Sequence, residues 1–429
     1  MKVIRQTTNK VAVLFIYIGC LLFFMMLVFP YMFMGVKIVL ISFLILAFLI
    51  KNNNHLHSRY VKWILLYFCM NLLYIIYGLL RHNPGIHYIL LVYLVWPILY
   101  LLFCSFSTQK VVQSLIKISY LAYCIIIIIG VIAFLQYNDF IPTIINVKML
   151  GFKSAVRPLF SFMAIHAGCI VSFVFLFPFY ISMYIFQQSF SKSIFNTIIL
   201  IFSFIFLFAT SRRALLLSII YFPIINYFFI CKSSPTKQLK KNTFKKMLIV
   251  FGIPVLLFLI YSIYIGLIDS NLFSQFISSA FSSDETYFSN IRRGQAVALA
   301  EGWLDSPFFG KGPGVNASVV QSYIPGAYEL SYLALLFSRG IIGFSIYIIQ
   351  ILLLIYWGIK LSKKANSKLK PIIISYNVAF VSFLISNASN PYLDAYDHMW
   401  VIFLYIGLQN VLLKQQEYEQ NNLCINKSI

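Results

Sequence analysis

The sequence is poor in charged residues, which make up 10% of its 429 positions, whereas they are about a quarter of a typical soluble domain. Acidic residues are the scarcest, with 11 Asp and Glu against 33 Lys and Arg. So little charge excludes a soluble globular protein. The net charge is +22, but the sequence contains no nucleic-acid-binding motif. We therefore expect no nucleic-acid partner.

The cysteines show no metal-binding or disulfide pattern. None of the seven belongs to a CxxC pair or a Cys/His cluster, and the sequence has no DxD motif. These absences exclude the usual zinc spacings and a disulfide framework. We therefore expect neither a metal nor another cofactor.

Long hydrophobic stretches dominate the chain, which is 61% hydrophobic and 18% aromatic. Runs of about 20 apolar residues recur, and each is long enough to cross a hydrocarbon core of about 30 Å. Backbone polar groups inside a bilayer must be satisfied within the segment, which favours helices. We predict an all-α polytopic integral membrane protein, a single membrane domain over 1–429. Its twelve predicted transmembrane helices are 11–30, 34–50, 63–80, 86–104, 116–136, 162–186, 194–210, 214–231, 247–268, 340–359, 371–388 and 399–413.

The lysines predict the orientation of these helices. If the N-terminus is cytoplasmic, 20 of the 24 lysines lie on the inner side, as the positive-inside rule requires. The densest clusters are at 232–246 and 360–370. We therefore predict cytoplasmic N- and C-termini.

Arginine has the opposite distribution, with seven of nine on the outer side. Moving a positive charge outward works against the membrane potential, at about 2.3 kcal/mol per 100 mV. A guanidinium differs from an ammonium in its planar fork, which binds phosphate through two hydrogen bonds. The alternatives are snorkelling at the boundary for Arg212 and Arg213, and helix flanking for Arg157. The outer arginines are Arg81, Arg157, Arg212, Arg213, Arg292, Arg293 and Arg339.

One predicted outer loop, 269–339 between the ninth and tenth helices, is long enough to form a subdomain with short helices. Within it, NIRRGQAVALAEGWL (290–304) predicts a helix capped by Ser289. Arg292 and Arg293 would then lie in the first turn, where free backbone N–H groups also attract anions. The following GKGPG (310–314) does not match a phosphate-binding Walker loop, and we expect a flexible turn.

Four further features near the outer boundary have chemical interest. Glu329 stands beside an apolar helix start and two tyrosines, a setting that raises a carboxylate pKa and suits a general base. Pairing with an arginine is the alternative. Tyr332 suits stacking on a sugar or anchoring at the interface. We expect His166 to pack within the sixth helix, and NASNPYLDAYDH (387–398) to be a polar turn or a sugar-binding segment.

The order of several motifs resembles the O-antigen polymerase and O-antigen ligase superfamily. These are Ser211-Arg212 after an outward helix, an arginine-bearing helix, the glycine-rich pattern from Ser306 to Gly314, and Gly340 to Gly343. The likeness covers roughly 150–400. It implies a bacterial inner-membrane glycosyltransferase that acts at the periplasmic face on undecaprenyl-diphosphate-linked oligosaccharides, without a metal. It also implies a chain-length regulator and a flippase as partners.

Ligase-like members carry a His-Asn pair where this chain has Glu329 and Leu330, which favours a polymerase over a ligase. O-antigen and capsule polymerases are not distinguished. A lipid-linked oligosaccharide flippase or other transporter is the alternative from another class, although the predicted helices have almost no mid-helix charge. The resemblance and the arginine pattern together select Arg292 and Glu329 as catalytic candidates. The candidates for binding diphosphate or substrate are Arg157, Arg212, Arg213, Arg293, Arg339 and Tyr332.

Overall fold

The computed structural model describes most of the chain, and the fold is predominantly helical. The described residues are 10–50, 56–105, 108–155, 163–210, 212–233, 237–268, 287–320, 325–365, 369–395 and 398–427. The helices are α1 (Lys10–Val28), α2 (Met34–Ile50), α3 (Ser58–Leu80), α4 (Ile86–Leu90), the π-helix η1 (Leu91–Val95), α5 (Trp96–Ser105), α6 (Gln109–Tyr137), α7 (Ile170–Phe186), α8 (Gln188–Ser191), α9 (Ile194–Ala209), α10 (Arg213–Ser233), α11 (Lys237–Ile268), α13 (Tyr287–Leu304), α14 (Ser331–Lys364), α15 (Lys370–Asn387) and α16 (Trp400–Lys427).

A helix lies in each of the apolar segments that the sequence predicts, and the segment 86–104 corresponds to the continuous run of α4, η1 and α5. Among the described residues, three helices are long and apolar enough to cross a membrane, namely α3, α6 and α14. Six shorter apolar stretches accompany them, in α1, α2, the α4–α5 run, α7, α9 and α10. The architecture is therefore that of a helical protein with membrane-compatible segments.

The predicted sixth helix, 162–186, is wrong for the described residues before Ile170. The strand β2 (Ala164–Ala167) lies there and pairs antiparallel with β1 (Phe152–Ala155), so α7 starts only at Ile170. The side chain of Asn138 holds the start of this hairpin by accepting from the Met163 N–H at 2.7 Å and donating to its carbonyl at 3.1 Å. Pairing with β1 satisfies the backbone of Ala164–Ala167, so this apolar sequence forms a strand and not a helix.

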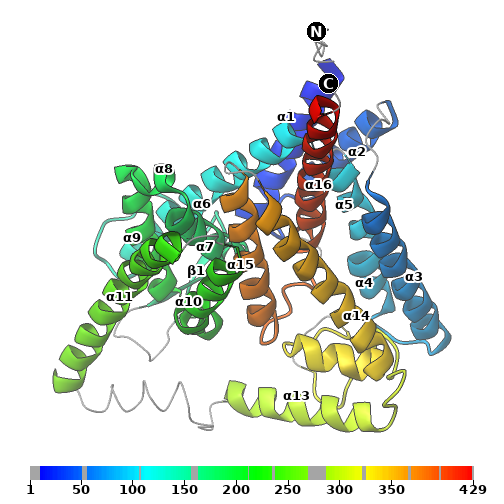
Figure 1. Ribbon diagram of the computed structural model, residues 1–429. Helices are drawn as coiled ribbons and strands as arrows, with labels where there is room; N and C mark the ends of the chain where they lie inside the picture. Colours follow the sequence, from blue (N-terminus) through cyan, green and yellow to red (C-terminus); the bar gives the residue numbers. More distant parts are fainter. Residues whose placement is uncertain are drawn as a thin grey trace.

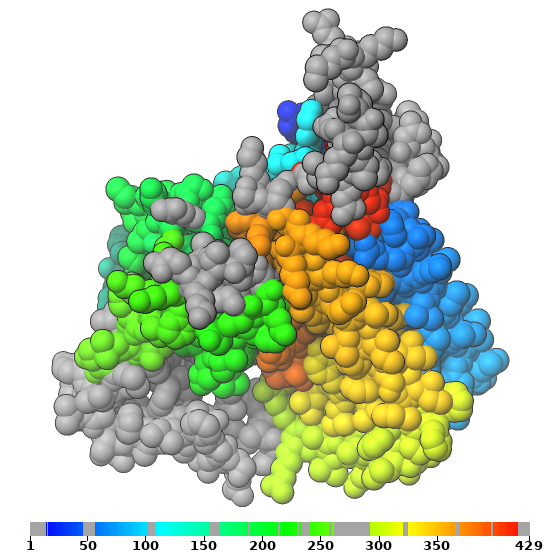
Figure 2. All heavy atoms as spheres, viewed as in Figure 1, coloured from blue at the N-terminus to red at the C-terminus, as the bar shows by residue number. Residues whose placement is uncertain are grey.

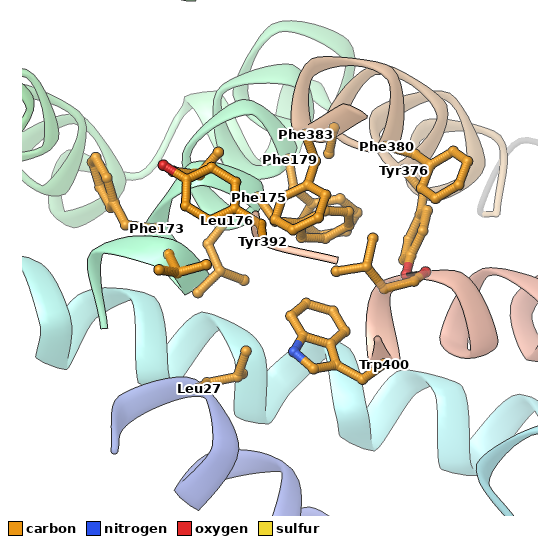
Figure 3. Packing of buried hydrophobic residues seen from close by; sticks show 14 of the residues in the cluster. Leu27, Phe173, Phe175, Leu176, Phe179, Tyr376, Phe380, Phe383, Tyr392 and Trp400 are labelled. Atoms are coloured by element: carbon orange, nitrogen blue, oxygen red, sulfur yellow. Dashed lines mark hydrogen bonds between the residues drawn. The ribbon is translucent and has the colours of Figure 1, made fainter. Parts of the chain in front are cut away.

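Helix α15 lies at the centre of the bundle, packed against α7, α10 and α14. Figure 3 shows aromatic side chains of α7, α15 and α16 in contact. The Phe175 ring lies 4.9 Å from that of Tyr376 and 5.2 Å from that of Trp400, centroid to centroid, both edge to face. Inside a bilayer the hydrophobic effect does not drive helices together, so close packing of this kind stabilises their association.

The start of α1 and the end of α16 lie at the upper end of the molecule, and α13 crosses the opposite end (Figure 1). Figure 2 shows the yellow-green surface of α13 there, with orange-red atoms of α15 between the green α10 and the yellow-orange α14. The connection between α15 and α16 returns into the bundle above α13. The α13 end therefore gathers segments that are far apart in sequence.

A glycine-dependent kink in α14 shapes the α13 end. Gly340 has φ 60° and ψ −174°, and the helix hydrogen bonds broken there are replaced by bonds from Ile341 and Ile342 N–H to the carbonyls of Pro307 and Phe308, at 2.8 and 3.2 Å. A Cβ at Gly340 would lie 2.3 Å from the Phe308 oxygen. Only glycine fits this backbone and this approach.

Candidate functional site

The connection between α15 and α16 forms the centre of the candidate site. It is fixed by short bonds: the Leu393 N–H donates to the Asn387 side chain at 2.8 Å, and the Tyr88 hydroxyl donates to the Asp394 carbonyl at 2.9 Å. Near its other end, His398 Nε2 lies 3.2 Å from the Tyr31 hydroxyl. These anchors hold Tyr392 and Asp394 in place between the helices.

The charges of two arginines act on Tyr392. Its ring packs 5.7 Å from that of Phe383, centroid to centroid, and only 4% of the residue is exposed. Burial raises the pKa of the Tyr392 hydroxyl, while the adjacent Arg212 and the charge of Arg292 lower that pKa. Arg212 precedes α10 and Arg292 belongs to α13, so charges from two segments far apart in sequence act on one residue of the connection between α15 and α16.

Arg212 also faces the β hairpin. Its Nη2 lies 3.4 Å from both ring nitrogens of His166, on β2. The prediction that His166 packs inside a helix is therefore wrong, because the residue is exposed on a strand. His166 therefore contacts the guanidinium group of Arg212 directly.

Arg292 forms an ion pair with Glu329. Its Nε donates to Oε2 of the carboxylate, and the two side chains are 40% and 29% exposed. The Glu329 N–H donates to the buried Gln295 side chain at 3.2 Å. The pair and this bond join α13 to the start of α14, and Glu329 is the counter-ion of Arg292 in this structure.

The predicted placement of Arg292 and Arg293 in the first helical turn is wrong. Helix α13 begins at Tyr287, three residues before the expected start, because the helix extends through the predicted cap Ser289. The two arginines lie in the second turn. The free backbone N–H groups of the first turn therefore do not join these two arginines in attracting an anion.

A second polar cluster surrounds Asp394. Its Oδ1 accepts a hydrogen bond from the Tyr93 hydroxyl. The guanidinium carbon of Arg339 lies 4.7 Å from the centre of the Tyr93 ring and 5.7 Å from that of Tyr74. Arg339 is only 4% exposed, so the aromatic rings and the nearby carboxylate replace water around its charge.

The remaining predicted residues have separate positions. Tyr332 donates from its hydroxyl to the Leu384 carbonyl at 2.7 Å, which joins α14 to α15. Arg293 is exposed and makes no ion pair or hydrogen bond within the described part of the chain. Arg157 lies outside the described residues, as does the side chain of Arg213.

The glycine turn 310–314 cannot hold a phosphate through its first amides. The N–H groups of Gly310, Lys311 and Gly312 donate to the carbonyls of Ser306, Phe337 and Ser338, each at 2.9 Å. The Asn83 side chain fixes the turn by donating to the carbonyls of Lys311 and Pro313, at 3.2 and 3.0 Å. The expectation of a flexible turn is wrong, since tertiary bonds anchor it.

Sequence reasoning did not select Tyr392, Asp394 or His398 as site residues. The available signal was the polar segment 387–398 between two apolar runs. His398 is 1% exposed, and burial, followed by the charges of Lys37 and Arg212, lowers its pKa to about 3. It is therefore neutral at physiological pH.

The described residues contain no group of three or more His, Cys, Asp or Glu side chains that could hold a metal ion. No protein-family model matches the chain, and no curated protein matches it significantly. The cluster of Arg212, Arg292 and Tyr392 is consequently the main guide to function.

Proposed function

We propose that this protein is an inner-membrane glycosyltransferase that polymerises undecaprenyl-diphosphate-linked oligosaccharide units into O-antigen or a related surface polysaccharide. Twelve membrane-spanning helices would carry it, with both termini cytoplasmic and the α13 end in the periplasm. The positions of the α1 start and the α16 end, opposite α13, support this orientation (Figure 1). The lipid-linked glycan would be its substrate, with a chain-length regulator and a flippase as partners.

One observation carries the proposal: the charges of Arg212 and Arg292, which come from different helical segments, both act on the buried hydroxyl of Tyr392. A diphosphate leaving group gains negative charge as its bond to the sugar breaks. Fixed cations aimed at that charge stabilise the transition state more than the ground state. Arginine suits this task because its fork donates two parallel hydrogen bonds to phosphate oxygens.

In the proposed reaction, a hydroxyl of one lipid-linked unit attacks the anomeric carbon of the other glycan. The new glycosidic bond forms, the bond to the diphosphate oxygen breaks, and its electron pair stays on the lipid diphosphate. Arg212 and Arg292 would bind that diphosphate, and Glu329 would hold Arg292 in position. Loss of one such donor is expected to cost about 2–4 kcal/mol, or about 30–1,000-fold in rate.

The surface glycan of cells that lack this protein tests the proposal. After gel separation, we expect lipid A core carrying one repeat unit, with the full ladder restored by wild type but not by Arg292→Ala. Arg81→Ala is the matched control, because Arg81 is exposed and stacks on Tyr77 away from the cluster. Lipid-linked polymer without attached glycan would indicate a ligase instead. An unchanged ladder in the deletion strain would contradict a role in either reaction.

A further inference from the structure

The proposed reaction releases a proton from the acceptor hydroxyl, and the carboxylate beside the arginines is already occupied. Glu329 accepts the hydrogen bond from Arg292, while its N–H is bonded to Gln295. These bonds join α13 to α14 and orient Arg292. A group that fixes another in this way is a positioning residue, so the proton requires a different acceptor.

Asp394 is a half-buried carboxylate two residues beyond Tyr392 on the same connection. Tyr93 donates to its Oδ1, and Tyr88 donates to its carbonyl at 2.9 Å. Among the residues that the structure describes, no hydrogen bond reaches Oδ2, and the residue is half-buried. One carboxylate oxygen is thus oriented, and the other accepts no hydrogen bond from a described residue, so it keeps the capacity to take up a proton that a general base requires.

The groups facing Asp394 come from four elements. Tyr67 of α3, Tyr88 of α4, Tyr93 of η1, and Tyr332, Arg339 and Tyr347 of α14 lie near it. Arg339 makes no ion pair with it within 4.0 Å in the described part of the chain. Burial raises the pKa of Asp394, while the Tyr93 hydrogen bond and the Arg339 charge oppose that rise in pKa. A raised carboxyl pKa brings proton uptake closer to neutral pH.

We propose that Asp394 is the catalytic base, with Tyr93 as the residue that orients it. This inference rests on the proposed function. The acceptor oxygen attacks the anomeric carbon while its proton passes to Asp394 Oδ2. The bond to the diphosphate oxygen breaks, and its electron pair leaves with the lipid diphosphate held by Arg212 and Arg292. Asp394 then loses the proton to water, so atoms and charges balance.

The placement separates two substrate positions along one connection. Tyr392 faces the cations that would bind the donor diphosphate, and Asp394 faces the tyrosines of α4, η1 and α14. A polymerase needs both positions, because two lipid-linked glycans react with each other. The acceptor sugar would therefore bind on the α4 and η1 side, where aromatic faces and hydroxyl groups suit a saccharide.

Asp394→Asn tests the base assignment in purified protein supplied with lipid-linked repeat units from the deletion strain. We expect at least a 100-fold lower rate of polymer formation, with donor binding and thermal stability retained. The matched control is Asp305→Asn, an exposed carboxylate that pairs with Lys311. Tyr93→Phe should lower the rate by about 3- to 10-fold, because it removes one orienting hydrogen bond of about 0.5–1.5 kcal/mol.

Chemical rescue distinguishes a base from a structural residue. In Asp394→Ala, added sodium formate should restore part of the rate, because formate supplies a carboxylate in the space left by the side chain. An Asp394→Asn protein with more than a third of the wild-type rate would overturn the assignment. So would a folded Asp394→Ala protein that formate does not rescue. Inactive wild-type protein would instead show that the proposed function itself has failed.

Discussion

Arg292 in α13 donates to the carboxylate of Glu329 at the start of α14, 37 residues later in the chain. This ion pair is only partly exposed, and it fixes a guanidinium group whose charge, like that of Arg212, acts on the Tyr392 hydroxyl. The ion pair with Glu329 thus positions Arg292 of α13, a helix far from α10 and α15 in sequence, so that its charge acts on the same tyrosine as that of Arg212. It also gives Arg292 and Glu329 different expected roles.

Replacement of each partner should therefore have different effects. We expect Arg292→Ala to lower the polymerisation rate about 30- to 1,000-fold, because a donor to the diphosphate is lost. Glu329→Gln should lower the rate less, by about 3- to 10-fold, since Arg292 remains but is less well oriented. Rates with purified protein measure both, with exposed Glu301→Gln as the control. Equal losses for Arg292→Ala and Glu329→Gln would contradict the separate roles.

At Arg212, even a conservative replacement should be damaging. Arg212→Lys keeps the charge but removes the fork that makes two parallel bonds to phosphate. We expect a rate about 10- to 100-fold lower, corresponding to one charged hydrogen bond of about 1.5–3 kcal/mol. Arg81→Lys, at the exposed α3–α4 turn, should have little effect. A fully active Arg212→Lys protein would rule out bidentate binding there.

The kink at Gly340 gives a prediction about stability. Gly340→Ala places a Cβ 2.3 Å from the Phe308 oxygen, on a backbone with φ 60°. We expect the variant to unfold in detergent at a clearly lower temperature, because backbone strain should lower its free energy of unfolding by about 1–3 kcal/mol. Gly252→Ala is the control, because no atom lies within 4 Å of its Cβ position in α11. Equal melting temperatures for the two variants would show that the kink is not required.

His398 makes stability depend on pH. Its pKa in the folded protein is about 3, below the ordinary value of 6.5, so the unfolded chain binds a proton more readily. The contribution of neutral His398 to the free energy of unfolding is fully present above pH 6.5. It decreases by about 1.4 kcal/mol per pH unit as the pH falls from 6.5 toward 3. Melting temperatures from pH 7 to pH 4 should fall less steeply for His398→Gln than for wild type. Parallel curves would contradict a neutral, buried His398.

Much of the helical arrangement could be predicted because apolar runs of membrane length have few alternatives to a helix. The strand at Ala164–Ala167 could not, since it depends on the side chain of Asn138, which lies before the hairpin. The start of α13 was misjudged because Ser289 was a plausible cap but the helix extends through it to Tyr287.

The site was predictable only in part. The distribution of arginine selected Arg212 and Arg292, whose charges act on Tyr392, and Arg339, which stacks on Tyr93. Pairing of Arg292 with Glu329 was one of two stated alternatives. The position of Asp394 beside Tyr93 depends on the fold, because 301 residues separate the two in sequence. No local pattern carries that information.

The most direct measurement is polymer formation by purified protein in lipid vesicles, with lipid-linked repeat units from the deletion strain as the only substrate. We predict that wild-type protein lengthens the glycan and releases one undecaprenyl diphosphate for each bond formed, without added metal. Arg292→Ala should do so at least about 30-fold more slowly, and Arg81→Ala at the wild-type rate. Active wild-type vesicles in which Arg292→Ala is equally fast would contradict the arginine site. Transfer of intact substrate across the bilayer without bond formation would contradict the polymerase itself.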